Sequence, residues 1–183
     1  MERVVIYGAY GYTGRLITEE AQDKGVDPVI SGRDEQRLSQ MAEEFNVEAH
    51  PCELDNPDKL DSILTEADVV IHCAGPFVYT AQPVVESCIR TQTHYLDITG
   101  EFQVFEKLAS WHQYAEEAGI MLLPGAGFDV VPTDCLAAYL RQQMPEASFL
   151  ELAFAGLGGG FSRGTAKTAV ENIDKGGLSA GSL

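Results

Sequence analysis

The chain has 183 residues, of which 45% are hydrophobic and 22% charged, a composition that is ordinary for a globular protein with its own core. Its 28 acidic and 12 basic residues give a net charge of −16, which argues against nucleic acid and anionic membranes as partners. Because no apolar run approaches the roughly 18 residues of a membrane span, and the N-terminus is typical of a core strand rather than a signal peptide, we expect a cytoplasmic protein without a transmembrane segment.

The four cysteines are scattered and form neither a C-x-x-C motif nor a Cys/His spacing typical of a metal site. We expect buried free thiols in a reducing compartment, with no disulfide and no metal site. They are Cys52, Cys73, Cys88 and Cys135.

A glycine-rich turn near the N-terminus predicts a dinucleotide site. A short apolar strand over residues 1–7 runs into a G-x-x-G-x-x-G motif, and a helix over residues 15–24 follows, closed by Gly25. A glycine at the turn lets bare backbone approach a pyrophosphate, and the helix N-terminus offers N–H groups and partial positive charge. The alternative is an ordinary glycine-rich turn. The residues expected to contact the cofactor here are Gly8, Tyr10, Gly11, Tyr12, Thr13 and Gly14.

The end of the second predicted strand, residues 28–31, indicates which dinucleotide is preferred. Enzymes that use NAD usually place Asp or Glu at this tip to bind the ribose 2′-hydroxyl, whereas this chain has Ser31-Gly32-Arg33. An arginine here, with Arg37 one helical turn later, can stack on adenine and pair with a 2′-phosphate. We therefore predict NADP(H) in preference to NAD(H), against the alternative of a solvated arginine beside acidic neighbours.

Strands and helices alternate along most of the remaining chain. Further strands are predicted at residues 47–50, 68–74, 94–98 and 120–123. The helices between the strands include two capped by Asp34 and Asn56 and two at residues 81–90 and 102–118. A last helix, capped by Thr133, follows the sixth strand. This α/β alternation predicts a Rossmann-type, doubly wound parallel sheet. We assign residues 1–146 to an NAD(P)-binding Rossmann domain. Residues 147–183, with a strand at 149–155 and a helix at 162–175, form the incomplete start of a second α/β substrate and dimerisation domain.

The loops after the third and fourth strands are expected to complete the cofactor site, since ligands of open α/β sheets lie at the carboxyl ends of the strands. Asp55 is placed beside the adenine amino group, although a solvating role in the loop fits equally well. The segment Cys73-Ala74-Gly75-Pro76 is placed near the nicotinamide ribose, with a plain strand-terminating turn as the alternative.

Polar residues after the fifth and sixth strands are candidates for the substrate side. Side chains alternate along a strand, so Tyr95 and Asp97 share one face. Asp97 and Thr99, near the end of the fifth strand, and Asp129, in the glycine-rich turn after the sixth, are the candidate catalytic residues. Glu101 is expected as the cap of the following helix.

Five motifs in order resemble the saccharopine dehydrogenase-like oxidoreductases, and within them the trans-acting enoyl reductase branch. They are YGAYGYTGRL at 7–16, SGR at 31–33, CAGPF at 73–77, HYLDITGE at 94–101 and PGAGFDVVPTD at 124–134, and FSRGT at 161–165 resembles that branch too. The resemblance implies an NADP-binding Rossmann domain, followed by an α/β domain that holds the substrate and forms a homodimer. It implies hydride transfer to or from a small or lipid-linked substrate of the enoyl or imine type.

Family members are generally about twice as long, so the chain is expected to be a fragment or a short member. A competing interpretation is an NADP(H)-binding module without catalysis, such as a sensor or a truncated domain. A third is a partner protein that completes its sheet by dimerisation. The short-chain dehydrogenase mechanism is disfavoured, because none of the seven tyrosines is followed four residues later by lysine.

Overall fold

A computed structural model of the protein describes residues 3–153. The strands are β1 Val4–Tyr7, β2 Val29–Gly32, β3 Ala49–Pro51, β4 Val69–His72, β5 His94–Asp97 and β6 Leu122–Leu123. The helices are α1 Tyr12–Asp23, α2 Glu35–Phe45, α3 Pro57–Leu64, α4 Phe77–Thr91, α5 Phe102–Ala109, α6 His112–Ala118 and α7 Val131–Gln143. Within this described part, no helix is both long and apolar enough to cross a membrane.

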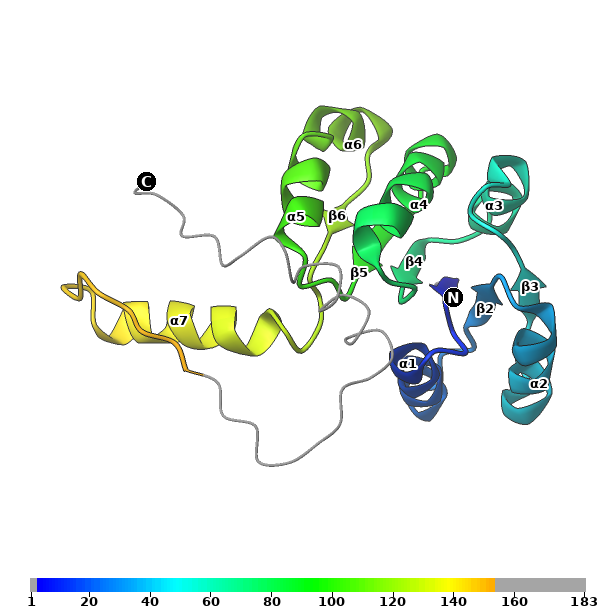
Figure 1. Ribbon diagram of the computed structural model, residues 1–183, viewed down its shortest axis with the longest axis horizontal. Coiled ribbons are helices and arrows are strands. Elements are labelled where there is room, and N and C mark those ends of the chain that lie inside the picture. Colours follow the sequence, from blue (N-terminus) through cyan, green and yellow to red (C-terminus); the bar gives the residue numbers. More distant parts are fainter. Residues whose placement is uncertain (1–2, 154–183) are drawn as a thin grey trace.

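The six strands form one parallel sheet, as the sequence predicts, and their order is β3-β2-β1-β4-β5-β6 (Figure 1). The chain first moves from β1 to β3 along one half of the sheet, then returns to the other side of β1 and continues to β6. The order therefore reverses between β1 and β4. In open parallel sheets, a crevice for ligands lies at such a reversal, outside the carboxyl ends of the strands. We call this side of the sheet the carboxyl edge.

Alternating side chains of β1 divide the apolar core into two layers. Val5 and Tyr7 point into a cluster built largely with α3, α4 and α5, whereas Ile6 points into a smaller cluster with α1 and α2. Helices therefore cover both faces of the sheet, which Figure 1 shows as α1 and α2 on one side and α3 to α6 on the other. This arrangement is the doubly wound α/β fold.

Two predicted helix caps are confirmed. The side chain of Asp34 accepts a hydrogen bond from the backbone N–H of Arg37 at the start of α2 (3.1 Å). Asn56 accepts in the same way from the N–H of Lys59 at the start of α3 (3.1 Å), and Pro57 opens that helix. Each cap satisfies a donor that the first helical turn would otherwise leave unpaired, a contribution of about 1 kcal/mol.

Three helices begin or end differently from the prediction. Helix α1 begins at Tyr12, so Gly14 lies inside its first turn rather than before it. Helix α4 begins at Phe77 rather than residue 81 and contains Pro83. The helix predicted over residues 102–118 is divided into α5 and α6, because the N–H of Trp111 bonds to the carbonyl of Leu108 in a tighter turn (3.0 Å).

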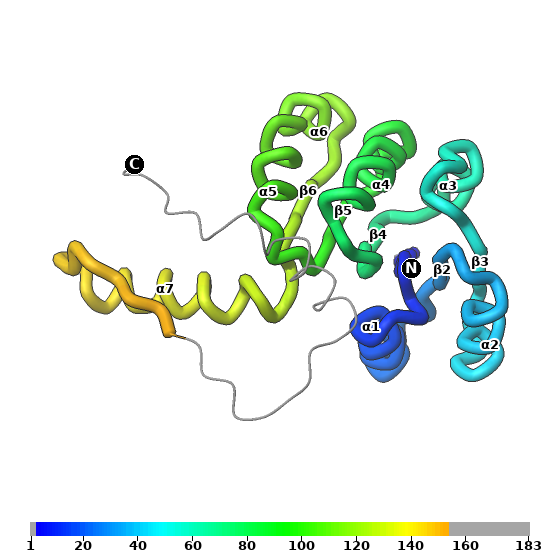
Figure 2. The backbone as a smooth tube through the Cα atoms, viewed as in Figure 1, coloured from blue at the N-terminus to red at the C-terminus, as the bar shows by residue number. Residues whose placement is uncertain are grey.

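The predicted cap of the last helix is wrong, because Thr133 lies within the first turn of α7. Its hydroxyl donates back to the carbonyl of Val130 (2.9 Å), and no side chain caps the helix. Helix α7 extends away from the sheet (Figure 2) and buries none of its residues.

The predicted strand at residues 149–155 is not present over its described part, since residues 149–153 adopt no regular structure. The rest of that strand, the helix predicted at 162–175 and the motif at 161–165 lie outside the described residues. The four cysteines are free thiols. Cys52 and Cys88 are buried and Cys73 is partly buried, but Cys135 is exposed, which corrects the expectation that all four are buried.

Candidate cofactor site

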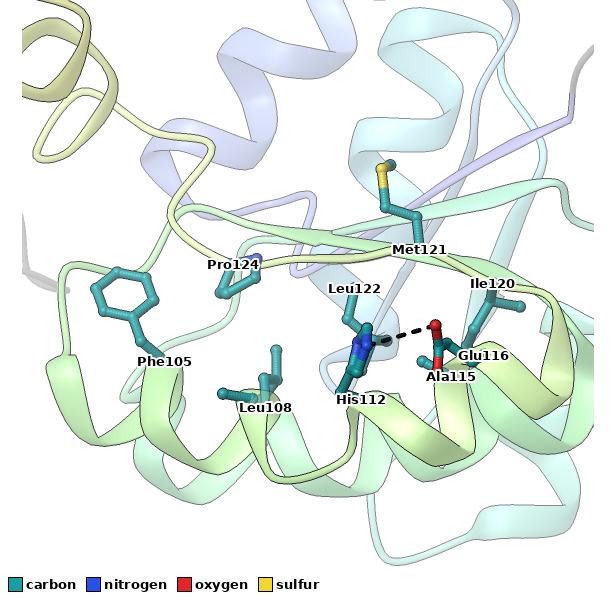
Figure 3. Close-up of a pocket in the computed structure, with 10 residues that line it drawn as sticks. Phe105, Leu108, His112, Ala115, Glu116, Ile120, Met121, Leu122 and Pro124 are labelled. Carbon is teal, nitrogen blue, oxygen red and sulfur yellow. Dashed lines mark ion pairs between the residues drawn. The ribbon is translucent and has the colours of Figure 1, made fainter. Parts of the chain in front are cut away.

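An apolar groove among the described residues lies away from the glycine turn. It has a volume of about 420 Å³ and is formed by α5, α6 and β6 (Figure 3). The ionisable side chains that line it are those of His112 and Glu116 on α6, whose Nε2 and Oε1 atoms lie 3.5 Å apart. None of the predicted site residues lines this groove. The predicted site residues lie instead in the loops at the carboxyl edge of the sheet.

The turn after β1 requires glycine at Gly8. Its φ is +83°, in the left-handed region that side chains disfavour, and its N–H donates to the carbonyl of Ser31 at 2.8 Å. A Cβ at this position would lie 2.8 Å from the Cβ of Ala74 and 2.9 Å from its backbone nitrogen. The turn is thus held by β2 on one side and packed against the end of β4 on the other.

Gly14 lets α1 pack directly on the same turn. A Cβ there would lie 2.5 Å from the carbonyl oxygen of Gly8 and 2.8 Å from the Cα of Ala9. Gly11 closes the turn with a hydrogen bond from its N–H to the Gly8 carbonyl (3.0 Å). The three glycines therefore bring bare backbone together at the start of the helix, which is the cradle that a pyrophosphate requires.

The N-terminus of α1 has no side-chain cap. Gly11 is its N-cap residue, and no acidic side chain lies in the first turn, in contrast to α2 and α3. Tyr12 is 73% exposed and Thr13 is partly exposed. The positive end of the helix dipole is therefore available to an anionic group from the solvent side.

Of the three residues at the tip of β2, two are buried and one is exposed. Ser31 is fully buried, and its hydroxyl donates to the carbonyl of His50 on β3 (2.8 Å). Gly32 is buried beneath the ring of Tyr10, where a Cβ would lie 2.6 Å from the ring carbon Cε1. Arg33 is exposed and has no hydrogen bond or ion pair among residues 3–153. Only Arg33 of these three presents a side chain to solvent.

The loop after β3 is fixed by Tyr7, whose hydroxyl donates to the carbonyl of Cys52 (2.9 Å). Burial raises the pKa of Tyr7 above its ordinary value, so this donor stays protonated. Asp55 follows in the same loop and is exposed. The structure thus places Asp55 at the carboxyl edge, next to the tip of β2 in the order of strands.

The segment after β4 meets the glycine turn directly. Cys73 donates its N–H to the carbonyl of Tyr7 (2.8 Å), and Ala74 contacts Gly8 as described. Gly75 is exposed and Pro76 is partly exposed. The cradle is therefore continuous from the end of β1 to the end of β4.

The first turn of α4 is capped from a distance by Glu101, a role that sequence reasoning missed. One carboxylate oxygen accepts from the N–H of Phe77 (3.1 Å) and the other from the N–H of Val78 (2.8 Å). Glu101 is only 5% exposed and precedes α5, the helix that it was expected to cap. No local signal identifies this contact, because the partners are more than twenty residues apart in sequence.

Asp97 is a buried acceptor that joins three segments. Its Oδ2 accepts from the hydroxyl of Tyr95 (2.7 Å), and its Oδ1 accepts from the N–H groups of Thr99 (3.0 Å) and Gly125 (2.8 Å). Burial raises the pKa of Asp97, and the two backbone donors and Tyr95 oppose that shift. Tyr95 and Asp97 thus share one face of β5, as predicted.

The other two candidate catalytic residues differ in exposure. Thr99 is 1% exposed, and its hydroxyl accepts from the N–H of Glu101 (3.0 Å). Asp129 is exposed and lies beside Gly100, so the turn after β6 meets the loop after β5. The structure therefore gathers all three residues at one end of the carboxyl edge, but only Asp129 faces solvent.

His72, at the end of β4, is buried among aromatic rings. Its ring centroid lies 5.6 Å from that of Tyr7 and 5.2 Å from that of Phe77, and its Nε2 is 3.0 Å from the hydroxyl of Thr80. The same hydroxyl also donates to the carbonyl of Pro76 (3.1 Å). Nδ1 has no partner in the described residues, and burial lowers the pKa of His72 to about 3.

This depressed pKa predicts a loss of stability in mild acid. Between pH 6.5 and 3 the unfolded chain binds a proton at His72 that the folded protein does not, so stability falls as the pH is lowered. From pH 7 to 5.5 we expect the wild type to lose roughly 1 kcal/mol more unfolding free energy than a His72→Leu variant. Urea unfolding at both pH values measures this difference.

The comparison with the variant isolates the contribution of His72. The raised pKa of Asp97 acts in the opposite direction, but it is common to both proteins and cancels. Identical pH dependence in His72→Leu and the wild type would contradict a buried neutral imidazole.

Comparison with known proteins agrees with this geometry. A family model described as the saccharopine dehydrogenase NADP binding domain matches residues 4–123, which span β1 to β6. A saccharopine dehydrogenase-like oxidoreductase from Mus musculus is 32% identical over 96% of the chain and 47% of its own length. A trans-acting enoyl reductase from Mycobacterium ulcerans is 28% identical over 82% of the chain and 38% of its own length.

The fold is also that of a solved saccharopine dehydrogenase (L-Glu forming) from Saccharomyces cerevisiae. The TM-score is 0.68 at 20% identity, over 80% of this chain and 32% of that one. The chain spans about half the length of the mouse relative. Since the family model covers the whole six-stranded sheet and its glycine turn, the chain belongs to the saccharopine dehydrogenase NADP-binding domain family.

Proposed function

We propose that this chain is the NADP(H)-binding part of an oxidoreductase of the saccharopine dehydrogenase type. The observation that carries the proposal is the uncapped N-terminus of α1, set on a turn that admits only glycine and next to the exposed Arg33. Backbone and helix dipole suit a pyrophosphate, and the arginine suits a 2′-phosphate. Bound NADP(H) supplies hydride chemistry at its nicotinamide ring.

The described residues have distinct roles in this proposal. The backbone from Gly8 to Gly14 binds the pyrophosphate, with Tyr12 and Thr13 on its solvent side. Arg33 pairs with the 2′-phosphate, and Asp55 lies by the adenine. Ser31 and Gly32 are buried, so they shape the site rather than contact the cofactor through side chains. The backbone of residues 73–76 borders the nicotinamide ribose, because it packs on the same turn.

On the substrate side, burial divides the three catalytic candidates. Asp97 and Thr99 hold the loops after β5 and β6 in place through the hydrogen bonds described. Asp129 is the exposed group at that position, and we propose it as the residue that contacts the hydride acceptor, directly or through a bridging water that polarises it. We propose an acceptor of the enoyl or imine type, small or lipid-linked. The name of the trans-acting enoyl reductase supports the enoyl type.

An NADP(H)-binding module without catalysis is the second candidate function. The burial of Asp97 and Thr99 favours it, since these two side chains already use their hydrogen-bonding groups within the protein. Hydride transfer from NADPH to an enoyl substrate distinguishes the oxidoreductase from the binding module. The transfer is followed by absorbance at 340 nm in a protein as long as the relatives. The division at residue 146, a homodimer and a cytoplasmic location stay predictions.

The cofactor preference tests the main proposal. Arg33→Gln should weaken NADPH binding by roughly tenfold to a hundredfold, because a charge-assisted contact to phosphate contributes about 1.5–3 kcal/mol. NADH lacks the 2′-phosphate, so its affinity should change less than about twofold. Isothermal calorimetry is the suitable measurement, because the one tryptophan, Trp111, lies beyond the far end of α5 from the carboxyl edge.

Lys24→Gln is the matched control, since it removes one positive charge at the opposite end of α1. It should leave both affinities unchanged. An equal loss of NADPH and NADH affinity in Arg33→Gln, or none, would remove the assignment of the 2′-phosphate to Arg33. A wild type that binds neither cofactor would contradict the proposed function itself.

A further inference from the structure

We propose that Tyr10 is a positioning residue for the 2′-phosphate of NADP(H), acting on the segment that carries Arg33. The inference rests on the proposed function and deepens it at the same site. Tyr10 lies in the glycine turn after β1, whereas Arg33 follows β2. The structure joins these two segments through the side chain and the carbonyl group of Tyr10.

The side chain of Tyr10 holds both neighbours of Arg33. Its ring packs on Gly32, where a Cβ would lie 2.6 Å from Cε1 and 3.2 Å from Cζ. Its hydroxyl accepts a hydrogen bond from the backbone N–H of Asp34 (3.1 Å). Arg33 therefore has its backbone fixed on both sides while its own side chain is exposed and has no ion pair among residues 3–153.

Arg37 completes the contact from α2. Its guanidinium lies over the Tyr10 ring, 4.8 Å from the centroid, and donates to the Tyr10 carbonyl (3.2 Å). The N–H of Arg37 is also the donor that Asp34 caps. The ring of Tyr10 is thus enclosed between the tip of β2 and the first turn of α2 and cannot swing out without breaking these contacts.

This arrangement affects one part of the ligand only. When the segment after β2 is held, Arg33 starts from a defined backbone position, and less conformational freedom is lost when a phosphate binds. Release of the segment lowers the fraction of molecules that are ready to bind the 2′-phosphate. The pyrophosphate cradle is formed by Gly8, Gly11 and Gly14, so the affinity of a ligand without the 2′-phosphate should change less than that of NADP(H).

Two substitutions of Tyr10 test the proposal, each with NADPH and NADH titrated by calorimetry. Tyr10→Phe removes the acceptor for Asp34 and keeps the ring, and should weaken NADPH binding about three- to tenfold. Tyr10→Leu also removes the ring beneath Arg37 and should weaken it by roughly tenfold or more. Because Tyr10 also lies within the glycine turn, the test is the ratio of the two affinities, and both variants should lose more NADPH affinity than NADH affinity. Tyr114→Phe, at an exposed tyrosine of α6, is the matched control.

The ratio of the two affinities distinguishes positioning from a purely structural role. Unchanged NADPH affinity in both Tyr10 variants overturns the inference while the wild-type preference for NADPH upholds the proposed function. Equal losses for NADPH and NADH also overturn it, because they indicate a general distortion of the turn. A wild type without preference for NADPH overturns the proposed function, and the role of Tyr10 falls with it. Thermal unfolding of each variant confirms that the affinities refer to folded protein.

Discussion

Alanine in place of Gly8 is expected to lower the unfolding free energy by about 3 kcal/mol and to abolish measurable NADPH binding. Two causes add at this position. The φ of +83° is unfavourable for any side chain, and the added methyl group would lie 2.8 Å from the Cβ of Ala74. The turn would have to move away from β4, and it would then no longer present its backbone to a pyrophosphate.

Gly25→Ala separates these two causes. Gly25 has nearly the same conformation, with a φ of +75°, but nothing lies within 4 Å of an added Cβ. Its substitution should therefore cost about 1 kcal/mol, from the backbone alone. Urea unfolding of both variants, followed by circular dichroism at pH 7.5, measures the difference. Equal losses would show that the contact between the glycine turn and β4 contributes nothing to stability.

Replacement of Asp97 with leucine is expected to destabilise the protein by about 3 kcal/mol or more. The hydroxyl of Tyr95 and the N–H groups of Thr99 and Gly125 would all lose their acceptor in a buried site. Each unpaired donor costs about 1–3 kcal/mol. Asp97→Asn should cost much less, since its amide oxygen can accept from both N–H groups, and the Tyr95 hydroxyl can rotate to accept from the amide nitrogen.

Urea unfolding at pH 7.5 measures the unfolding free energy of the two Asp97 variants. Asp129→Leu, at an exposed aspartate of the same edge, is the control and should stay within about 0.5 kcal/mol of the wild type. If Asp97→Leu and Asp97→Asn were equally stable, the three hydrogen bonds would not hold the loops. A stable Asp97→Asn variant also allows the role of Asp97 in hydride transfer to be measured in a folded protein.

Local patterns in the sequence predicted most of the sheet and two of the caps. The strands are short apolar runs between turn residues, and Asp34 and Asn56 each precede a helix with the expected spacing. Each of these signals involves only a few neighbouring residues, so it can be recognised without knowledge of the rest of the fold. The carboxyl ends of parallel strands lie on one edge, which is why the candidate residues, from several loops, lie at the same edge of the structure.

What the sequence did not reveal depends on contacts between distant segments. Helix α4 begins four residues earlier than predicted because Glu101, from another loop, supplies the acceptors that its first turn needs. The burial of Ser31 and the engagement of Asp97 likewise follow from neighbours on other strands. Tyr10 was predicted only as a contact of the cofactor. Its hydrogen bond to the segment after β2 is seen only in the structure.

The two helices that flank the reversal of the sheet differ in their electrostatics. At α4 the positive end of the dipole is already neutralised by the buried carboxylate of Glu101, whereas α1 has no side-chain cap and no acidic residue in its first turn. An anionic ligand that crosses this edge therefore gains attraction at one helix only. The two helix N-termini therefore differ in their attraction for an anion. This difference favours one orientation of an elongated ligand that carries its negative charge at one end.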